Sequence, residues 1–280
     1  MQTLRRIDLM SIGKIYAVLG AIYGLVAMLV FDAVFAVLGK TLFPAALSGA
    51  LGGAVIIGLP ILGIVGGAIL GFIFSVISAA IYNVIAEAIG GVKFNISGKQ
   101  ASVNGIDMRS YVKIVAIGAL IAGLVLGIVV TFALPSLLSS AMMGTGGAVL
   151  GVVSGFALVG LPVLFLIIGA IGAAVYAILF NFFTKNVGGI GVNISGKPTA
   201  LKRVDPMGYA KIVTLIGVVM TLIIGVLTAL GTGHDFSAGA VRIVTSLITN
   251  VIATFVSAYI GILIFNFVAS KIGGIVIDLK

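Results

Sequence analysis

The sequence predicts an all-α integral membrane protein made of three tandem two-helix repeats, with six transmembrane helices, pseudo-threefold symmetry and short cytoplasmic β-hairpins. Three observations lead to this fold class. Of the 280 residues, 61% are hydrophobic and only 8% are charged, whereas a soluble domain carries about 25% charged residues. Apolar runs longer than about 18 residues, enough to span a bilayer, recur along the chain. Two short motifs also recur three times in the same order.

The first motif opens each repeat where a polar segment enters an apolar run. An aspartate is followed six residues later by a lysine, in the pairs Asp8 and Lys14, Asp107 and Lys113, and Asp205 and Lys211. The simplest interpretation is a helix start at the membrane interface, with the aspartate beside the positive end of the helix dipole and the lysine reaching back to water. The lining of a pore is the alternative role.

The second motif closes each repeat with an asparagine seven residues before a glycine pair. The asparagines are Asn83, Asn181 and Asn266. Together the two motifs divide the chain into repeats at 1–100, 101–200 and 201–280. Three amides that converge on a pseudo-threefold axis would line a polar pore. The favoured alternative is that they hydrogen-bond across helices and fix their register, each bond contributing about 1 kcal/mol or less in a membrane.

Each repeat is expected to cross the membrane twice. The first helices are Ile15–Leu38, Val112–Leu134 and Ala210–Leu230, each long enough to span the hydrocarbon core. The second run of the first repeat, Gly49–Ile89, is interrupted at Gly58–Pro60, and Gly160–Pro162 interrupts the second repeat in the same way. Proline there indicates either a re-entrant segment before a spanning helix or one long kinked helix.

The distribution of basic residues predicts the topology. Fourteen of the sixteen lie at the N-terminus, between the repeats or at the C-terminus, whereas only Lys40 and Arg242 lie on the other side. By the positive-inside rule, a multi-pass protein of the cell membrane with both termini in the cytoplasm is expected. This topology also accounts for the net charge of +9, so nucleic acid is not an expected partner.

The links between repeats are expected to be β-hairpins. Gly90-Gly91 suits a left-handed helix cap, after which Val92–Ile96 and Ala101–Ile106 alternate as strands around a turn at Ser97–Lys99. The same pattern recurs at 189–204. Gln2–Ile7 and Ile275–Leu279 would then lack partners. We therefore expect the two ends of the chain to pair with each other and close a ring.

Asp32 is the one acid well inside an apolar helix. An intramembrane carboxylate is a functional candidate by default. The favoured alternative is an acid near the outer interface, beside Lys40. The other two repeats carry no acid at the equivalent position, which counts against a proton-translocating rotor subunit.

Small residues four positions apart predict closely packed helices. Examples are Gly63, Gly67 and Gly71, as well as Ala119, Gly123 and Gly127. Gly20 and Gly24 repeat this spacing. Small residues at this interval allow helix backbones to approach each other in lipid, so the abundant glycine is interpreted as structural.

No cofactor or metal site is expected, because the chain has no cysteine and a single histidine. Gly191–Lys197 has the Gly-x-x-x-x-Gly-Lys spacing of a phosphate-binding loop. The next residue is Pro198, however, where the motif needs a Ser or Thr hydroxyl for Mg²⁺. A hairpin turn is the better interpretation.

At these motifs the chain resembles a family of small two-helix transmembrane domains of unknown function, known from actinobacteria and archaea. The family pattern is Arg-[Ile/Val]-Asp-x-x-Ser-x-x-Lys before one helix and Tyr-Asn…Gly-Gly after the second. The first repeat matches it best, through Arg6-Ile7-Asp8, Ser11, Lys14, Tyr82-Asn83 and Gly90-Gly91. The resemblance implies two helices per unit and covers nearly the whole chain as a triplication. It implies no activity.

The sequence therefore predicts a non-enzymatic membrane protein, either a structural scaffold or an accessory subunit of a larger complex. Its expected partners are the lipid bilayer and other membrane subunits or further copies of itself. The alternative is an ion channel or transporter with its pore on the pseudo-threefold axis. An enzyme is not expected, since no catalytic cluster is present in the sequence.

Overall fold

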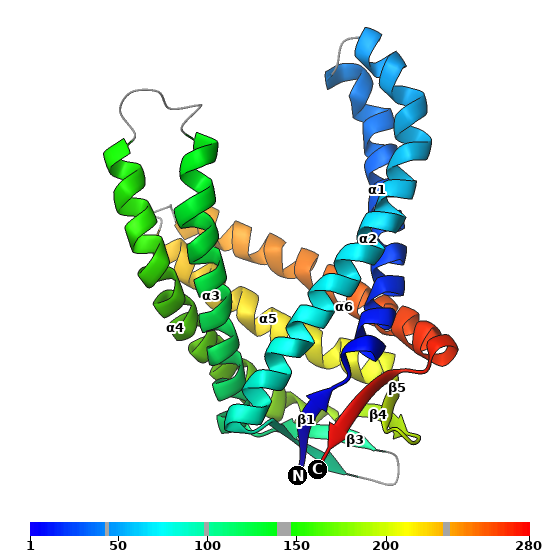
Figure 1. The fold of residues 1–280 in the computed structure, drawn as a ribbon, viewed down its shortest axis with the longest axis vertical. Helices are drawn as coiled ribbons and strands as arrows, with labels where there is room; N and C mark the ends of the chain where they lie inside the picture. Colours follow the sequence, from blue (N-terminus) through cyan, green and yellow to red (C-terminus); the bar gives the residue numbers. More distant parts are fainter. Residues whose placement is uncertain (43–44, 98–100, 139–146, 232–235) are drawn as a thin grey trace.

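The computed structural model describes residues 1–42, 45–97, 101–138, 147–231 and 236–280. Along the chain, the order strand, helix, helix, strand occurs three times (Figure 1). The elements are β1 (Gln2–Ile7), α1 (Leu9–Leu42), α2 (Ala45–Ile89), β2 (Val92–Ser97), β3 (Ser102–Ile106), α3 (Met108–Leu138), α4 (Gly147–Val187), β4 (Ile190–Ser195), β5 (Ala200–Val204), α5 (Pro206–Gly231), α6 (Phe236–Ile272) and β6 (Ile275–Leu279).

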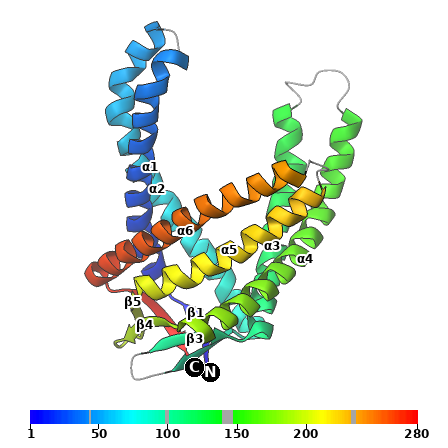
Figure 2. The ribbon, with the colours of Figure 1, turned by 180° about the vertical axis from the view of Figure 1, so that it is seen from behind.

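The six strands form one closed antiparallel barrel in chain order. The barrel closes where β1 pairs with β6, and the two termini lie side by side there (Figures 1 and 2). Thr3 N–H donates to Lys280 O at 2.6 Å, and Lys280 N–H donates to Thr3 O at 3.0 Å. The predicted pairing of the chain ends is confirmed. The fold is predominantly helical, as predicted, and the strands of the predicted hairpins join in one barrel in which each described strand has a partner on both sides, so these strands leave no open sheet edge.

The strands lie close to their predicted positions. β2, β3, β4 and β5 start and end within one residue of the expected segments. β5 begins at Ala200, so the repeat boundary expected between residues 200 and 201 falls inside this strand. Most of the turn predicted after Ser97 lies outside the described residues.

The glycine pairs satisfy two separate requirements at each passage from helix to strand. The first glycine adopts a positive φ, for example 87° at Gly90 and 105° at Gly273, a conformation that costs glycine little. The second glycine lies so close to a neighbouring strand that a side chain would not fit there. A methyl group added at Gly91 would collide with the carbonyl oxygen of Leu4. The predicted left-handed cap is confirmed, and the close approach explains why a second glycine follows.

Among the described residues, six helices are long and apolar enough to cross a membrane. α2 continues through Pro60 and α4 through Pro162, so the re-entrant alternative at these prolines is wrong. At 1.5 Å per residue, the 45 residues of α2 extend about 68 Å, roughly twice the thickness of a hydrocarbon core.

The helices form three hairpins, α1–α2, α3–α4 and α5–α6. The first two diverge with distance from the barrel, whereas α5–α6 is strongly inclined to both in these views (Figures 1 and 2). In the first hairpin, a methyl group at Gly20 would collide with Gly67 O and one at Gly24 with Gly63 O. In the second, a methyl group at Gly123 would lie 2.8 Å from Leu161 O. The predicted close helix packing is confirmed in both hairpins.

The main core lies where the three hairpins leave the barrel. One buried apolar cluster joins barrel residues such as Val92 and Ile190 to the first turns of the odd-numbered helices. Ile15 and Ile212 are fully buried there. The helix faces beyond this cluster carry many exposed large apolar side chains, as expected for surfaces in contact with lipid.

Candidate functional site

The predicted aspartates cap the helices that follow them. Asp8 Oδ1 accepts the Ser11 N–H at 2.7 Å, and Asp107 Oδ1 accepts the Ser110 N–H at 2.9 Å. Asp205 accepts the Gly208 N–H through Oδ2 at 2.8 Å. Each carboxylate thus takes a donor that a helix N-terminus leaves without a partner, at the positive end of the dipole.

Two serines connect these caps to the adjacent strand. Ser11 Oγ accepts the N–H of Val276 on β6 at 2.9 Å, and Ser110 Oγ accepts the N–H of Lys93 on β2 at 3.0 Å. The third strand–helix–helix–strand unit, β5–α5–α6–β6, has Gly208 at this position and therefore no hydroxyl. The first two helix starts are consequently tied to the barrel by one more hydrogen bond than the third.

The three asparagines make matching contacts with a strand. Each amide oxygen accepts, and each amide nitrogen donates to, the backbone of the residue just before a capping aspartate. Asn83 makes both bonds to Ile7 at 2.8 Å. Asn181 bonds Ile106 at 2.7 and 2.9 Å, and Asn266 bonds Val204 at 2.9 and 2.8 Å. Each amide thereby joins the end of an even-numbered helix to the last residue of a strand.

This contact is neither of the two roles weighed from the sequence. The amides bond a strand backbone rather than a second helix, and the residue that each one bonds is the last of β1, β3 or β5. The partner could not be predicted from the sequence, because the strand residue lies 62 to 76 positions away from its asparagine.

The lysines of the opening motif are exposed, whereas the residue after each one is buried. Lys14, Lys113 and Lys211 are followed directly by Ile15, Ile114 and Ile212, which belong to the buried cluster. The motif defined from the sequence included the lysines but not the isoleucine that follows each of them. That recurrence marked the inward face of the first helical turn.

Tyr82, which the sequence singled out only as part of the family pattern, lies on the last turns of α2 and makes contacts that the sequence did not predict. Its hydroxyl donates to Leu4 O at 2.6 Å and accepts the Val92 N–H at 3.3 Å, which ties β1 to β2. The equivalent positions in the other units are Phe180 and Phe265. This anchor therefore belongs to the first unit only.

Asp107 has the clearest electrostatic signature at these junctions. The backbone hydrogen bond from Ser110 holds the pKa of its carboxyl below the ordinary value of 3.8, and the hydroxyl of Ser110 and the charges of Lys93 and Arg109 act in the same direction. Hydrogen bonds to the charged form favour ionisation. The carboxylate is largely exposed, which suits a cap rather than a proton carrier.

Asp32 lies in α1, far from these junctions. Both of its carboxylate oxygens are buried, and neither has a hydrogen-bond partner among the residues that the structure describes. The side chain of Lys40, its expected neighbour, lies outside the described residues. Both interpretations of Asp32, a functional acid and an acid near the outer interface, stay predictions.

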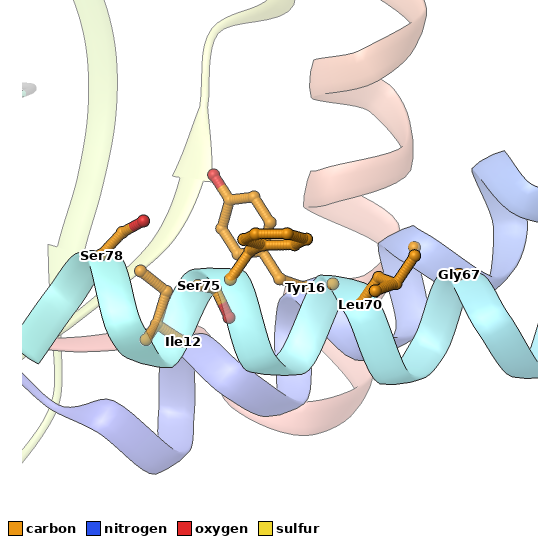
Figure 3. Close-up of a pocket in the computed structure, with 9 residues that line it drawn as sticks. Ile12, Tyr16, Gly67, Leu70, Ser75 and Ser78 are labelled. Atoms are coloured by element: carbon orange, nitrogen blue, oxygen red, sulfur yellow. The ribbon is translucent and has the colours of Figure 1, made fainter. Parts of the chain in front are cut away.

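A groove of about 370 Å³ runs beside the glycine crossing of α1 and α2. Ile12, Ser75 and Ser78 lie toward one end, and Leu70 and Gly67 toward the other (Figure 3). The Ser75 hydroxyl donates to Phe72 O within its own helix at 2.9 Å. The lining is mainly apolar, and its polar groups are the hydroxyls of Tyr16, Ser75 and Ser78.

Comparisons with protein-family models, with curated proteins and with solved structures gave no match to this chain. The resemblance to the two-helix transmembrane family therefore stays a prediction. Within the part of the chain that the structure describes, no group of three or more His, Cys, Asp or Glu side chains is placed to hold a metal ion.

Proposed function

We propose that this chain is a non-enzymatic multi-pass protein of the cell membrane that acts as a structural scaffold or as an accessory subunit of a membrane complex. Its N- and C-termini lie in the cytoplasm in this proposal. The chain is a triplication of one strand–helix–helix–strand unit with pseudo-threefold symmetry. The observation that carries the proposal is the closed barrel at the basic end of otherwise apolar hairpins.

The recurring hydrogen bonds support the triplication. Three aspartates cap three helices, and three asparagines make paired bonds to the residue before each cap. Such agreement between distant parts of one chain is expected when copies of a single unit share one fold.

The barrel supports the role in assembly. Fourteen of the sixteen basic residues and five of the seven acids lie on the strands, on their links or within about two turns of the barrel. The hairpins themselves offer mainly apolar surface. A rigid, charged platform held at the cytoplasmic face of a membrane is a suitable docking surface for acidic regions of another subunit.

The alternative of a channel or transporter has less support. The amides proposed to line its pore are occupied by backbone hydrogen bonds. Ile15, Ile114 and Ile212 are buried in one apolar cluster at the helix starts, where a pore on the axis would need polar groups.

Extraction from native membranes in a gentle detergent, followed by native-gel sizing and mass spectrometry of the purified band, tests the assembly role. Foreign subunits in fixed stoichiometry are the expected result. A band of this chain alone would contradict the accessory role.

A pair of variants then tests the docking surface. The double variant Lys202→Glu and Arg203→Glu reverses charge on β5 and should release those subunits. The matched control, Lys40→Glu with Arg242→Glu, reverses the same charge on the two basic residues that lie away from the barrel in the chain and should retain them. Equal loss in both would contradict docking on the barrel.

A further inference from the structure

A second groove, of about 930 Å³, lies at the junction of β1, β2, β6 and the end of α2. Three cations line it, namely Arg5 and Arg6 of β1 and Lys93 of β2. Two carboxylates also line it, Glu87 of α2 and Asp278 of β6. The groove therefore offers both signs of charge in one place.

The charged side chains of this groove are available to a ligand. All five are exposed. Arg6 and Asp278 lie opposite each other in the β1–β6 pairing, and Lys93 lies opposite Thr3 in the β1–β2 pairing. In the part of the chain that the structure describes, no ion pair within 4 Å joins these cations to these acids.

One wall of the groove is apolar and belongs to a membrane-spanning helix. Ala80 and Val84 of α2 contribute to it, and Val84 is 67% exposed. Both residues lie within the candidate span Gly58–Ile89. The groove thus joins charged groups at the end of a span to an apolar surface that continues along the helix, which is the arrangement of a phospholipid head group and its chains.

We propose that this groove binds a phospholipid whose head group carries an N–H or O–H donor. Arg5, Arg6 and Lys93 bind the phosphate, because guanidinium and ammonium groups form charge-assisted hydrogen bonds to phosphate oxygens. Glu87 and Asp278 accept hydrogen bonds from the ammonium or hydroxyl of the head group. The acyl chains lie along Ala80 and Val84.

The second unit lacks this site. The residues equivalent to Arg5, Arg6 and Lys93 there are Asn104, Gly105 and Gly191. The third unit has Lys202 and Arg203 but Val276 in place of the lysine. One lipid per chain at this position is therefore expected. The inference rests on the proposed membrane topology, although it requires no partner protein.

The test uses the full chain, purified and delipidated in a neutral detergent. Phosphatidylethanolamine, phosphatidylglycerol and phosphatidylcholine are titrated separately, and bound lipid is counted by native mass spectrometry. The first two should bind and phosphatidylcholine should bind more weakly, because its quaternary ammonium has no hydrogen-bond donor. Equal binding of all three would overturn the assignment, as would displacement of bound lipid by inorganic phosphate at an equal concentration.

Three variants separate this site from general surface charge. The variant Arg5→Gln, Arg6→Gln, Lys93→Gln should lower the affinity for phosphatidylethanolamine about tenfold or more. The control Arg109→Gln, Lys185→Gln, Lys271→Gln removes the same charge from this end of the molecule and should bind as the unmodified chain does. An equal loss in the control would overturn the proposal. Glu87→Gln with Asp278→Asn should keep phosphate binding and reduce the preference over phosphatidylcholine.

Failure here and failure of the proposed function give different results. A chain that binds phosphatidylethanolamine through this groove but purifies without foreign subunits contradicts only the accessory role. A chain that purifies with such subunits, yet binds the three lipids equally, contradicts only the lipid site.

Discussion

The α1–α2 and α5–α6 hairpins bring their helices together in different ways. In α1–α2, glycines of both helices place one backbone against the other, so that Gly20 meets Gly67 and Gly24 meets Gly63. In α5–α6, the atoms nearest to a methyl group added at Gly217 belong to the Thr254 side chain, the closest at 3.8 Å. The same residue type therefore has different importance in the two hairpins, since a backbone cannot move aside as a side chain can.

Polar contacts reinforce this contrast. The crossing of α5 and α6 includes a hydrogen bond from Asn250 Nδ2 to Thr221 Oγ1 at 3.2 Å. Interhelical hydrogen bonds of this kind contribute about 0.6 kcal/mol on average in a membrane. The third hairpin thus uses side chains where the first uses direct backbone contact.

The largest expected effect is that of Gly67→Ala. Its methyl group would collide with Gly20 O, so α1 and α2 must separate, at a cost of about 3 kcal/mol. Thermal unfolding in detergent measures the loss. Gly66→Ala is the matched control, since a methyl group there meets nothing within 4 Å. Gly217→Ala in α5 should cost much less than Gly67→Ala, and equal losses would remove the contrast between the hairpins.

Loss of the asparagine bonds to the strand ends should lower stability by a similar amount in both hairpins. Asn83→Ala and Asn266→Ala each leave one backbone N–H and one C=O of a strand end without their partner, which costs about 1–3 kcal/mol per site. The measurement is the unfolding midpoint of the two variants under one condition. A loss confined to Asn83→Ala would mean that the crossing, rather than the junction with the barrel, determines the effect.

The glycine crossing and the asparagine bonds show which features could be predicted from the sequence and which could not. Four-residue glycine spacing is a local pattern, so the close packing of α1 and α2 was predictable. The strands were predictable from alternation and turn residues, and the pairing of the chain ends followed from counting strands without partners. The bonds made by the asparagines could not be predicted, because Asn83 and Ile7 are 76 residues apart and an amide has no preferred partner in sequence. The pairings of β1 with β2, β3 with β4, and β5 with β6 likewise followed from no local pattern, since each of them spans two intervening helices.

A smaller effect is expected for Tyr82→Phe. The change removes the hydroxyl that donates to Leu4 O and accepts the Val92 N–H, and a typical hydrogen bond contributes about 1 kcal/mol. The third unit has Phe265 at this position, so the variant makes the first junction resemble the third. Hydrogen exchange at the Val92 amide should accelerate while the barrel remains folded. An unchanged exchange rate would show that the hydroxyl does not hold β1 against β2.

The smallest effect is the pH dependence of the cap on α3, between the two hairpins compared above. The folded chain holds the pKa of Asp107 below its ordinary value of 3.8. The carboxylate therefore stabilises the fold fully above that value, and the contribution is lost as pH falls through the lower, folded pKa. Because the group is largely exposed and screened, the effect should be about 0.5 kcal/mol or less.

Asp107→Asn keeps a capping oxygen and removes the charge. The difference in unfolding midpoint between the two proteins should be constant from pH 7 to pH 5 and shrink below about pH 4. A difference that grows on acidification would mean that the carboxylate is not stabilised in its ionised form, and that the bond from Ser110 is not what fixes the start of the helix.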